Sequence, residues 1–473
     1  MRSQMVSLLF CLVLLISAVG CTDTTQLVKD AQPTKVELLE EINNEHRSIS
    51  REEIDPTPYL RTSISFEDYK KHAALYEKDV LKDSYRADKP LTVEQATDDV
   101  NYLFDAFYYT YALYDYFGGS TAYETARQAI LEDLSGKDAL TAEELQDILL
   151  THLDFMKDGH FNINTWNTAR TTKIPFFFRK RSFLKTENGY ETSDGKTVSF
   201  VDNHGDLDDL FKRSISHDGY LVYYPVLLKN SKFKDAYNKK QFCDEKLTIH
   251  YTDGSSETLT AEPYQIYHKN LPNNAVSRTR KIGNIAELKL NSFKKGFKQM
   301  DLKKILLGAN YLKSSPTAIY DLRSNGGGDE SVVYDWLREY SGQRISGSGR
   351  RFNAYTGEPI SSLRGHWIKN KNTLLVLCGK WSASGSEITL DCLYHLENCV
   401  IIGENTFGAM IGNNGGIELP NSKCIVHFTQ RTVYVSAESS KKYFEEMGGF
   451  IPDIWVPAAN AEDLAVKLWN NLQ

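Results

Sequence analysis

Three serines stand between an apolar run and a stretch with helical periodicity, and they are well placed for nucleophilic chemistry. Residues 373–378 (Thr-Leu-Leu-Val-Leu-Cys) are typical of a buried strand, and apolar side chains recur at helical spacing over residues 388–396. Ser382, Ser384 and Ser386 therefore lie where backbone N–H groups and the positive end of a helix dipole point outward. A serine that attacks a carbonyl there forms an oxyanion that these groups stabilise.

The same serines also fit a purely structural role. Ser384 and Glu387 have the spacing of a capping box, and Ser382 or Ser386 could cap the same helix. Helix caps are far commoner than catalytic serines, so this stretch by itself favours a cap. A nucleophilic role needs support from other parts of the chain.

A second predicted strand end carries three consecutive glycines. Residues 317–322 are typical of a strand, and residues 321–328 are Asp-Leu-Arg-Ser-Asn-Gly-Gly-Gly. Glycines after a buried strand let the backbone approach a ligand, and successive N–H groups can point at one oxygen. The alternative is a flexible turn; a phosphate loop is excluded because Gly-Lys-Ser/Thr is missing. Together with the serines, the motif favours one half of an oxyanion hole.

One histidine lies at a predicted helix–turn–strand junction. Residues 157–164, Lys-Asp-Gly-His-Phe-Asn-Ile-Asn, combine an Asp-Gly turn with a short alternation typical of a strand. A lone histidine is more often a surface or packing residue. His160 is therefore a candidate base only if another feature of the chain points to it.

Periodicity and composition divide the chain into parts that would position these residues. Strand and helix patterns alternate after residue 281, which is typical of an α/β domain with a largely parallel sheet. Sites in such folds gather at the carboxyl ends of strands. The predicted parts are a signal peptide (1–20), a tether with N-terminal helices (21–91), a helical cap ending in Asp-Gly-His (92–171), a β-rich module (172–280), an α/β domain (281–460) and a C-terminal helix (461–473).

The N-terminus is predicted to direct export. Arg2 precedes an apolar run over residues 5–16 that is too short for a membrane span. Cys21 follows at the position of the lipidated cysteine in a bacterial lipoprotein signal, with a plain secretory signal as the alternative. In both cases the mature protein leaves the cytoplasm. The lipoprotein interpretation places it on a periplasm-facing membrane of the cell envelope.

Charge and cysteine content argue against several other classes. The formal net charge is −7 and no long basic run occurs, so a nucleic acid partner is not expected. No Cys-x-x-Cys pair occurs, so no structural metal is expected. Cys392 and Cys399 could pair in an oxidising compartment, but burial in a core is the commoner fate of such cysteines.

The two strand-end motifs together resemble peptidase family S41, which includes the C-terminal processing proteases, the tricorn core protease and the interphotoreceptor retinoid-binding protein modules. Residues 321–328 resemble the family's Asp-Leu-Arg-x-Asn-x-Gly-Gly motif. Residues 382–387, Ser-Ala-Ser-Gly-Ser-Glu, resemble its nucleophile motif, in which the serine three residues before the glutamate attacks. That serine is Ser384. Residues 403–408 and 449–454 also match family landmarks.

This resemblance covers roughly residues 92–460 and implies a crotonase/ClpP-like α/β core. It is weakest in the β-rich module, where processing proteases carry a PDZ domain and a degenerate PDZ-like unit is one alternative. It implies a serine endopeptidase that uses no cofactor and no metal. Its partners would be peptides or unfolded proteins, and the membrane through the lipid anchor.

One departure from the family pattern determines the implied base. Ser–Lys members carry a lysine after Thr-Phe-Gly, where this chain has Ala409, and Asn413 stands where a supporting glutamine is expected. The tricorn-like branch instead uses a histidine from the end of its helical region, and residues 158–160, Asp-Gly-His, match it in type and order. The resemblance therefore implies Ser384 as nucleophile and His160 as general base.

The resemblance also implies the supporting groups of the site. A glutamate near the C-terminus supports the histidine in the tricorn-like branch; Glu446 matches its position best, with Glu445 as fallback. Asp158 is the alternative, because a glycine rather than the tricorn serine precedes the histidine. The backbone N–H groups of Gly327 and Gly385 are implied as the oxyanion hole.

Two other functions fit parts of the sequence. A retired peptidase that binds a peptide or apolar ligand without cutting it is favoured by Ala409, which cannot accept a proton. A crotonase-type acyl-CoA enzyme shares the core and the paired backbone donors, but acyl-CoA substrates are cytoplasmic and the predicted export signal argues against it. An α/β-hydrolase is disfavoured, since no Gly-x-Ser-x-Gly elbow occurs.

Overall fold

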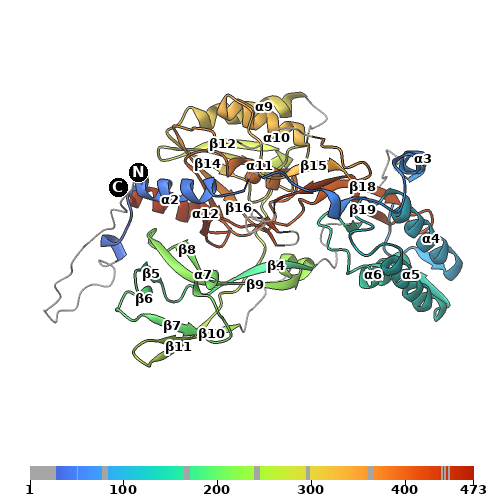
Figure 1. The fold of residues 1–473 in the computed structure, drawn as a ribbon, viewed down its shortest axis with the longest axis horizontal. Helices are drawn as coiled ribbons and strands as arrows, with labels where there is room; N and C mark the ends of the chain where they lie inside the picture. The colour runs from blue at the N-terminus through green and yellow to red at the C-terminus, as the bar shows by residue number, and fades with distance from the viewer. Residues whose placement is uncertain are drawn as a thin grey trace, which may run out of the picture.

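A computed structural model describes residues 28–473, except residues 51, 77–83, 165–170, 239–244, 295–298, 361–365, 438–439, 441–443 and 446–447. The predicted signal peptide, residues 1–20, and the predicted lipid attachment site, Cys21, lie outside the described residues. The described part has the predicted mixed α/β fold. In Figure 1 an α/β domain lies above a β-rich module, and a helical cap lies at the right.

A six-stranded sheet forms the centre of the α/β domain. Its strand order is β12-β13-β14-β16-β17-β22, and every neighbouring pair is parallel except the antiparallel edge pair β12–β13. Edge strand β12 was not predicted, because its charged, mostly exposed side chains form no apolar run. The strands are β12 (Ser277–Ile282), β13 (Ile285–Leu290), β14 (Thr317–Asp321), β16 (Thr373–Cys378), β17 (Cys399–Gly403) and β22 (Ile454–Trp455).

Helices cover both faces of this sheet. Leu374 and Val376 of β16 pack in one core with helices α9, α10 and α11, whereas Leu375 and Leu377 pack in another with α2 and α12. Because both faces of each central strand are buried, its side chains are apolar without alternation. The helices are α2 (Lys35–Arg47), α9 (Gln299–Lys313), α10 (Glu330–Ser341), α11 (Gly385–Leu393) and α12 (Ala461–Asn471).

Two helices of the cap begin with capping boxes. Thr92 caps α4 with Gln95, and Thr141 caps α6 with Glu144. The short strands that precede these helices pair with each other. The cap contains α3 (Phe66–Tyr76), β1 (Pro90–Thr92), α4 (Val93–Thr110), α5 (Gly119–Ser135), β2 (Ala139–Thr141) and α6 (Ala142–His152), with the single turn η1 (Thr57–Tyr59) before them.

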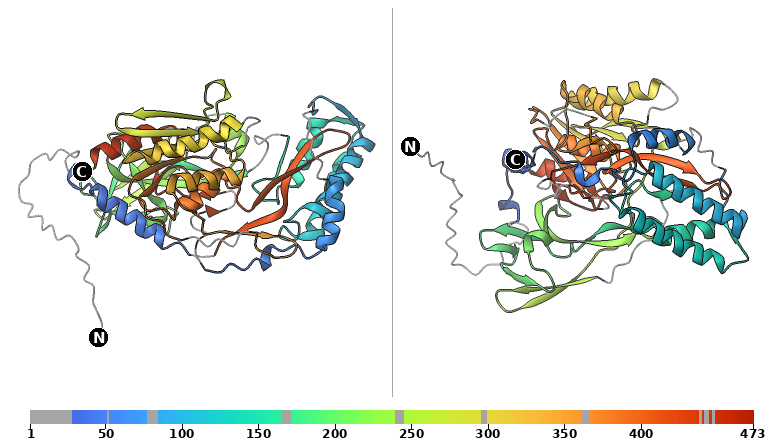
Figure 2. Two further views of the ribbon diagram at one scale, coloured as in Figure 1. Left: turned by 90° about the horizontal axis from the view of Figure 1, so that it is seen from above. Right: turned by 45° about the vertical axis from the view of Figure 1, so that its right-hand side comes forward.

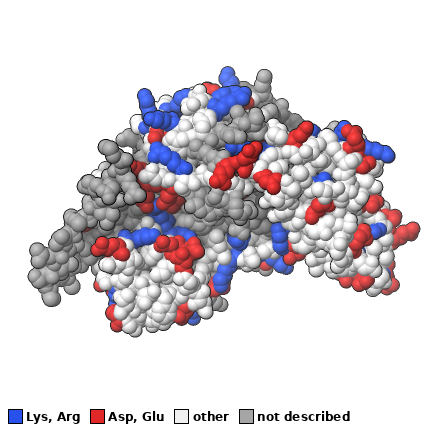
Figure 3. Space-filling view, viewed as in Figure 1, with Lys and Arg blue, Asp and Glu red and all other residues white. Residues whose placement is uncertain are grey.

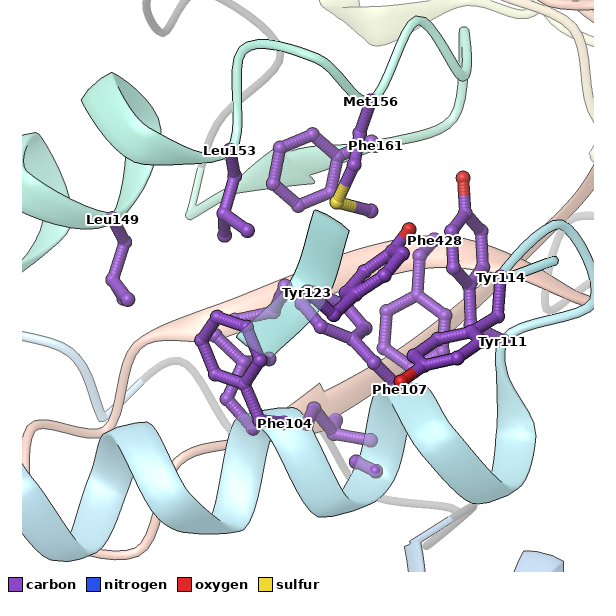
Figure 4. Close-up of a cluster of buried hydrophobic side chains, with 14 of the residues drawn as sticks. Phe104, Phe107, Tyr111, Tyr114, Tyr123, Leu149, Leu153, Met156, Phe161 and Phe428 are labelled. Atoms are coloured by element: carbon purple, nitrogen blue, oxygen red, sulfur yellow. The ribbon is translucent and has the colours of Figure 1, made fainter. Parts of the chain in front are cut away.

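A long hairpin connects the α/β domain with the cap. The hairpin consists of β18 and β19, and β15 and β3 both pair with β19, so the strand order is β15-β19-β18. Figure 2 shows the hairpin extending to the cap helices. Phe428 lies in the aromatic core of the cap beside Phe107 and Tyr111 (Figure 4). The hairpin thus shares the cap's core, although the predicted boundary put it with the α/β domain. The four strands of this sheet are β3 (Asn162–Ile163), β15 (Arg350–Asn353), β18 (Gly412–Glu418) and β19 (Ile425–Val435).

The β-rich module has two small sheets whose core reaches the α/β domain. Its buried cluster includes Ala383, which directly precedes the predicted nucleophile, and Phe407 and Ala409 of the loop after β17. No observation tests its predicted likeness to a PDZ unit. Its elements are β4 (Thr171–Phe177), β5 (Phe183–Thr186), β6 (Gly189–Thr192), β7 (Val198–Val201), α7 (Leu207–Leu210), β8 (Phe211–Ile215), β9 (Leu221–Lys232), α8 (Phe233–Asn238), β10 (Lys246–Tyr251) and β11 (Ser256–Thr260); the turn η2 (Pro272–Asn274) follows, and β20 (Phe444–Glu445) and β21 (Gly449–Phe450) pair near the C-terminus.

Cys392 and Cys399 are free and buried, as are the other two described cysteines, so these two do not form the disulfide considered above. Cys392 and Cys399 each lie in the apolar core between the sheet and its helices. No helix within the described ranges is long and apolar enough to cross a membrane. On the face shown in Figure 3, acidic and basic side chains are interspersed.

Candidate active site

Ser384 lies at a sharp turn between β16 and α11. Its backbone angles, φ 50° and ψ −110°, are rare for a residue with a side chain. Such a conformation costs on the order of 1–3 kcal/mol and persists only where surrounding contacts hold it. The turn leaves the Ser384 side chain partly exposed at the N-terminus of α11.

The two neighbouring serines have structural roles. The buried hydroxyl of Ser382 donates to the Leu322 carbonyl at 2.8 Å, and that of Ser386 donates to the Asn325 carbonyl at 2.8 Å. Both therefore hold the serine turn against the glycine loop. These distant acceptors could not be inferred from local spacing, which had left all three serines open as caps or nucleophiles.

Glu387 fixes the backbone around Ser384. Its fully buried carboxylate accepts the Ser384 N–H at 2.9 Å, as one half of the predicted capping box. It also accepts the Thr406 hydroxyl at 2.6 Å and the N–H groups of Gly408 and Ala409 at 2.7 and 2.8 Å. One carboxylate therefore joins the serine turn to the loop after β17. The predicted helix-capping role of Ser384 and Glu387 is therefore compatible with a reactive Ser384 side chain.

His160 lies beside Ser384. Its Nε2 atom is 3.3 Å from Ser384 Oγ, although 224 positions separate the two residues in sequence. The imidazole is buried, with 1% of its surface exposed. This distance is slightly longer than an ordinary hydrogen bond, as is common for catalytic pairs without bound substrate. The arrangement allows proton transfer from the hydroxyl to the ring.

Asp158 holds the backbone of His160 rather than its ring. One carboxylate oxygen accepts the His160 N–H at 2.8 Å, and the other accepts the Thr429 N–H of β19 at 3.0 Å. The nearest carboxylate oxygen is 4.0 Å from His160 Nδ1, which is too long for a hydrogen bond. Glu446 lies outside the described residues, and the backbone of Glu445 lies in β20.

The glycine loop lies directly against the serine turn. A Cβ atom added to Gly327 would lie 2.7 Å from the Ala383 carbonyl oxygen and 2.9 Å from Ser384 Cβ. Gly327 also has a φ of 93°, which favours glycine. Its N–H, however, already donates to the Asn325 side chain at 2.9 Å. This bond turns the predicted Gly327 donor away from a substrate oxygen.

The next glycine is better placed as a donor. Phe293 forms a parallel bridge with Gly328 through the Gly327 carbonyl and the Asp329 N–H, at 2.9 and 3.2 Å. The N–H of Gly328 itself therefore points to the opposite side. A Cβ added to Gly385 would lie 3.2 Å from Gly328 N, so these two backbone groups are neighbours. The N–H groups of Gly328 and Gly385 are therefore the candidate oxyanion donors, because the N–H of Gly327 already has an acceptor.

Asp321 and Arg323 of the same motif form a buried ion pair. The Arg323 guanidinium donates to both Asp321 oxygens, at 2.9 and 2.8 Å, and to the Ala458 carbonyl at 2.7 Å. Burial alone would raise the pKa of Asp321, but the hydrogen bonds and charge of Arg323 outweigh it and hold that pKa below its usual value. The pair anchors the start of the glycine loop.

A nearby acidic trio does not favour a cation site. Oxygens of Glu287, Asp321 and Glu462 lie within 4.8 Å of one another. Arg280 bonds to Glu287 and Glu462, and Arg323 bonds to Asp321 and Glu462. The guanidinium groups therefore neutralise the carboxylates that a metal would need.

A partly exposed serine beside an imidazole and two backbone N–H groups defines a site for acyl transfer. Residues 284–456 match the sequence model described as Peptidase family S41. The tail-specific protease of Haemophilus influenzae is 32% identical over 129 residues, which cover 26% of this chain and 17% of that protein. The chain thus matches less than a fifth of that relative's length. The match over residues 284–456 is to the family of serine-type peptidases that the motifs predicted.

Solved structures of S41-related proteins share low sequence identity with this chain. Mature CPAF complexed with lactacystin is 12% identical, with 80% of this chain and 98% of that chain covered and a TM-score of 0.44. The photosystem II D1 C-terminal processing protease is 14% identical, with 78% of this chain and 94% of that chain covered and a TM-score of 0.32.

Proposed function

We propose that this protein is a serine endopeptidase that hydrolyses peptide bonds of peptides or unfolded proteins by acyl transfer. The observation that carries the proposal is the 3.3 Å approach of His160 Nε2 to Ser384 Oγ beside two backbone donors. The family match supports it. No cofactor or metal enters the reaction.

The mechanism uses three groups of this chain. His160 Nε2 accepts the Ser384 proton as Oγ attacks the peptide carbonyl, and the N–H groups of Gly328 and Gly385 stabilise the oxyanion. The imidazolium then donates its proton to the leaving amine, and a water activated by the same ring releases the acyl group. A positioned base contributes about 10²–10⁴-fold and one oxyanion donor about 10²–10³-fold in rate.

Ser384→Ala and His160→Ala test the two main roles. Each variant should abolish cleavage of an unfolded protein substrate while leaving the melting temperature nearly unchanged. His427→Ala is the matched control, because this half-buried histidine lies on β19 and its ring bonds to the Gly415 carbonyl. Unchanged activity of His160→Ala would exclude this histidine as the base.

A fluorophosphonate probe distinguishes an active peptidase from a peptidase-like protein that has lost its activity. An activated serine should react, so wild type should be labelled and Ser384→Ala should not. Absence of labelling in the wild type would instead support a protein that binds a peptide or apolar ligand without cutting it. Ala409 favours that alternative only by lacking an amine, and its N–H is engaged by Glu387.

We also propose that the protein is exported and anchored in the cell envelope through a lipid on Cys21. The sequence of residues 1–21 supports this location. Replacing Cys21 with Ala should move the protein from the membrane fraction to the soluble envelope fraction. A Cys21→Ala protein that stays in the membrane fraction would contradict the anchor.

A further inference from the structure

Lys380 is a fully buried lysine that the proposed mechanism does not use. It lies four residues before Ser384, and none of its surface is exposed. Removing an ammonium group from water costs several kcal/mol unless hydrogen bonds and nearby opposite charge compensate. The contacts of the Lys380 ammonium group must therefore compensate for its burial, and they show what it holds in place.

The ammonium group joins two loops beside the serine turn. Lys380 Nζ donates to the Thr406 carbonyl and, at 3.3 Å, to the Gly448 carbonyl. The Asn405 side chain donates to the same Gly448 carbonyl at 2.6 Å, and Phe450 N–H donates to the Thr406 hydroxyl at 2.7 Å. The segment that leads into β21 is thus held to the loop after β17.

The contacts continue from this loop to the nucleophile. The hydroxyl of Thr406 donates to one oxygen of Glu387, and the Ser384 N–H donates to the other. Two residues, Thr406 and Glu387, therefore connect Lys380 with the Ser384 backbone through hydrogen bonds. The bonds of Lys380 to the described residues include those to the main-chain carbonyls of Thr406 and Gly448, which place the ammonium group beside these loops.

A buried carboxyl group, that of Glu404, lies close enough to Lys380 to interact with its charge. This buried carboxyl accepts the Ala458 N–H and, at 2.8 Å, the Tyr264 hydroxyl. Burial raises the pKa of Glu404 to about 7, while these hydrogen bonds and the charge of Lys380 act to lower it. The lysine thus lies between a buried carboxyl and the loops around the site.

We propose that Lys380 is a positioning residue for acyl transfer, whose ammonium group holds the Thr406 and Gly448 loops in the arrangement that keeps Glu387 and Ser384 aligned. The proposal rests on the proposed peptidase function. Loss of the ammonium group should lower the reactivity of Ser384 rather than the affinity for substrate, because Lys380 is buried behind the site.

Lys380→Met tests the proposal, since it removes the charge and keeps the length of the side chain. We expect kcat and the rate of fluorophosphonate labelling to fall about 10- to 100-fold, with KM nearly unchanged, on the scale of removing one positioning contact. Lys89→Met is the matched control: the Lys89 ammonium also donates to a main-chain carbonyl, that of Asn421, but in the cap. It should leave the labelling rate unchanged.

A second variant covers the case in which Lys380→Met does not fold. Thr406→Val keeps the carbonyl that accepts from Lys380 but removes the hydroxyl that donates to Glu387, so it should slow labelling in the same way. Folded Lys380→Met or Thr406→Val protein with wild-type labelling would overturn the proposal. An equal loss in Lys89→Met would also overturn it. Failure of the peptidase function itself would appear separately, as wild-type protein that is not labelled.

Discussion

Ser384 has an unfavourable backbone conformation at the position where the reaction requires a side chain. With φ 50° and ψ −110°, a glycine would fit this turn without strain. We expect Ser384→Gly to be more stable than Ser384→Ala by about 1 kcal/mol, a difference that urea unfolding can measure. Equal stability of the two inactive variants would show that the turn is not strained.

Asp158 acts on His160 through the main chain. Its carboxylate accepts two N–H groups, from His160 and from Thr429. Asp158→Ala should leave both without their partner, destabilise the fold by about 2 kcal/mol and lower kcat because the imidazole is displaced. Asp154→Ala is the control, since Asp154 is exposed and pairs with Lys157 on the surface. An Asp158→Ala enzyme with wild-type kcat would contradict this role.

Strand β19 joins the elements that carry the two side chains proposed to be catalytic, Ser384 and His160. Near its middle, Thr429 holds the loop of His160 through Asp158. Near its C-terminal end, the Tyr434 hydroxyl donates to Asp391 of α11, the helix that begins after Ser384. The cap therefore positions the imidazole through a strand that also contacts the nucleophile's helix. Movement of β19 should change the distance between base and nucleophile.

Phe428→Ala tests this link at the level of the element. Phe428 of β19 and Phe104 of α4 both lie in the cap core (Figure 4), so truncation of either should destabilise by about 3–5 kcal/mol. Only Phe428→Ala should also lower kcat at a temperature where both variants are folded. Similar kcat values for Phe428→Ala and Phe104→Ala would mean that β19 does not transmit cap packing to the site.

Glu404 connects two parts of the molecule, because Tyr264 from the C-terminal part of the β-rich module and Ala458 before α12 both donate hydrogen bonds to it. Its pKa is raised from 4.5 to about 7 by burial. Between these pH values the folded chain keeps a proton that the unfolded chain has lost, so stability falls as the pH rises. Above about pH 7 the protein has lost all of the stabilisation that this proton provides, on the order of 3 kcal/mol.

Glu404→Gln removes this titration while keeping an acceptor for the Ala458 N–H. We expect the free energy of unfolding of wild type, relative to that of Glu404→Gln, to decrease by a few kcal/mol between pH 5 and pH 8. Urea unfolding at several pH values measures this difference. A constant difference across that range would show that Glu404 does not titrate there.

Local sequence determined the elements and the two strand ends that carry the chemistry. The apolar run at residues 373–378 is continuous because both faces of this strand are buried, so this strand and the one at residues 317–322 could be predicted within a residue. Thr92 and Thr141 marked helix starts because a capping box is completed within four residues.

Tertiary structure alone decided which groups meet. It brought His160 beside Ser384, gave the Gly327 N–H an acceptor in the Asn325 side chain, and placed β19 in the core of the cap. It also buried Lys380, whose position after a strand gave no indication of its partners. The reason is physical: periodicity and caps depend on residues a few positions apart, whereas hydrogen-bond partners dozens or hundreds of positions away depend on how the elements pack.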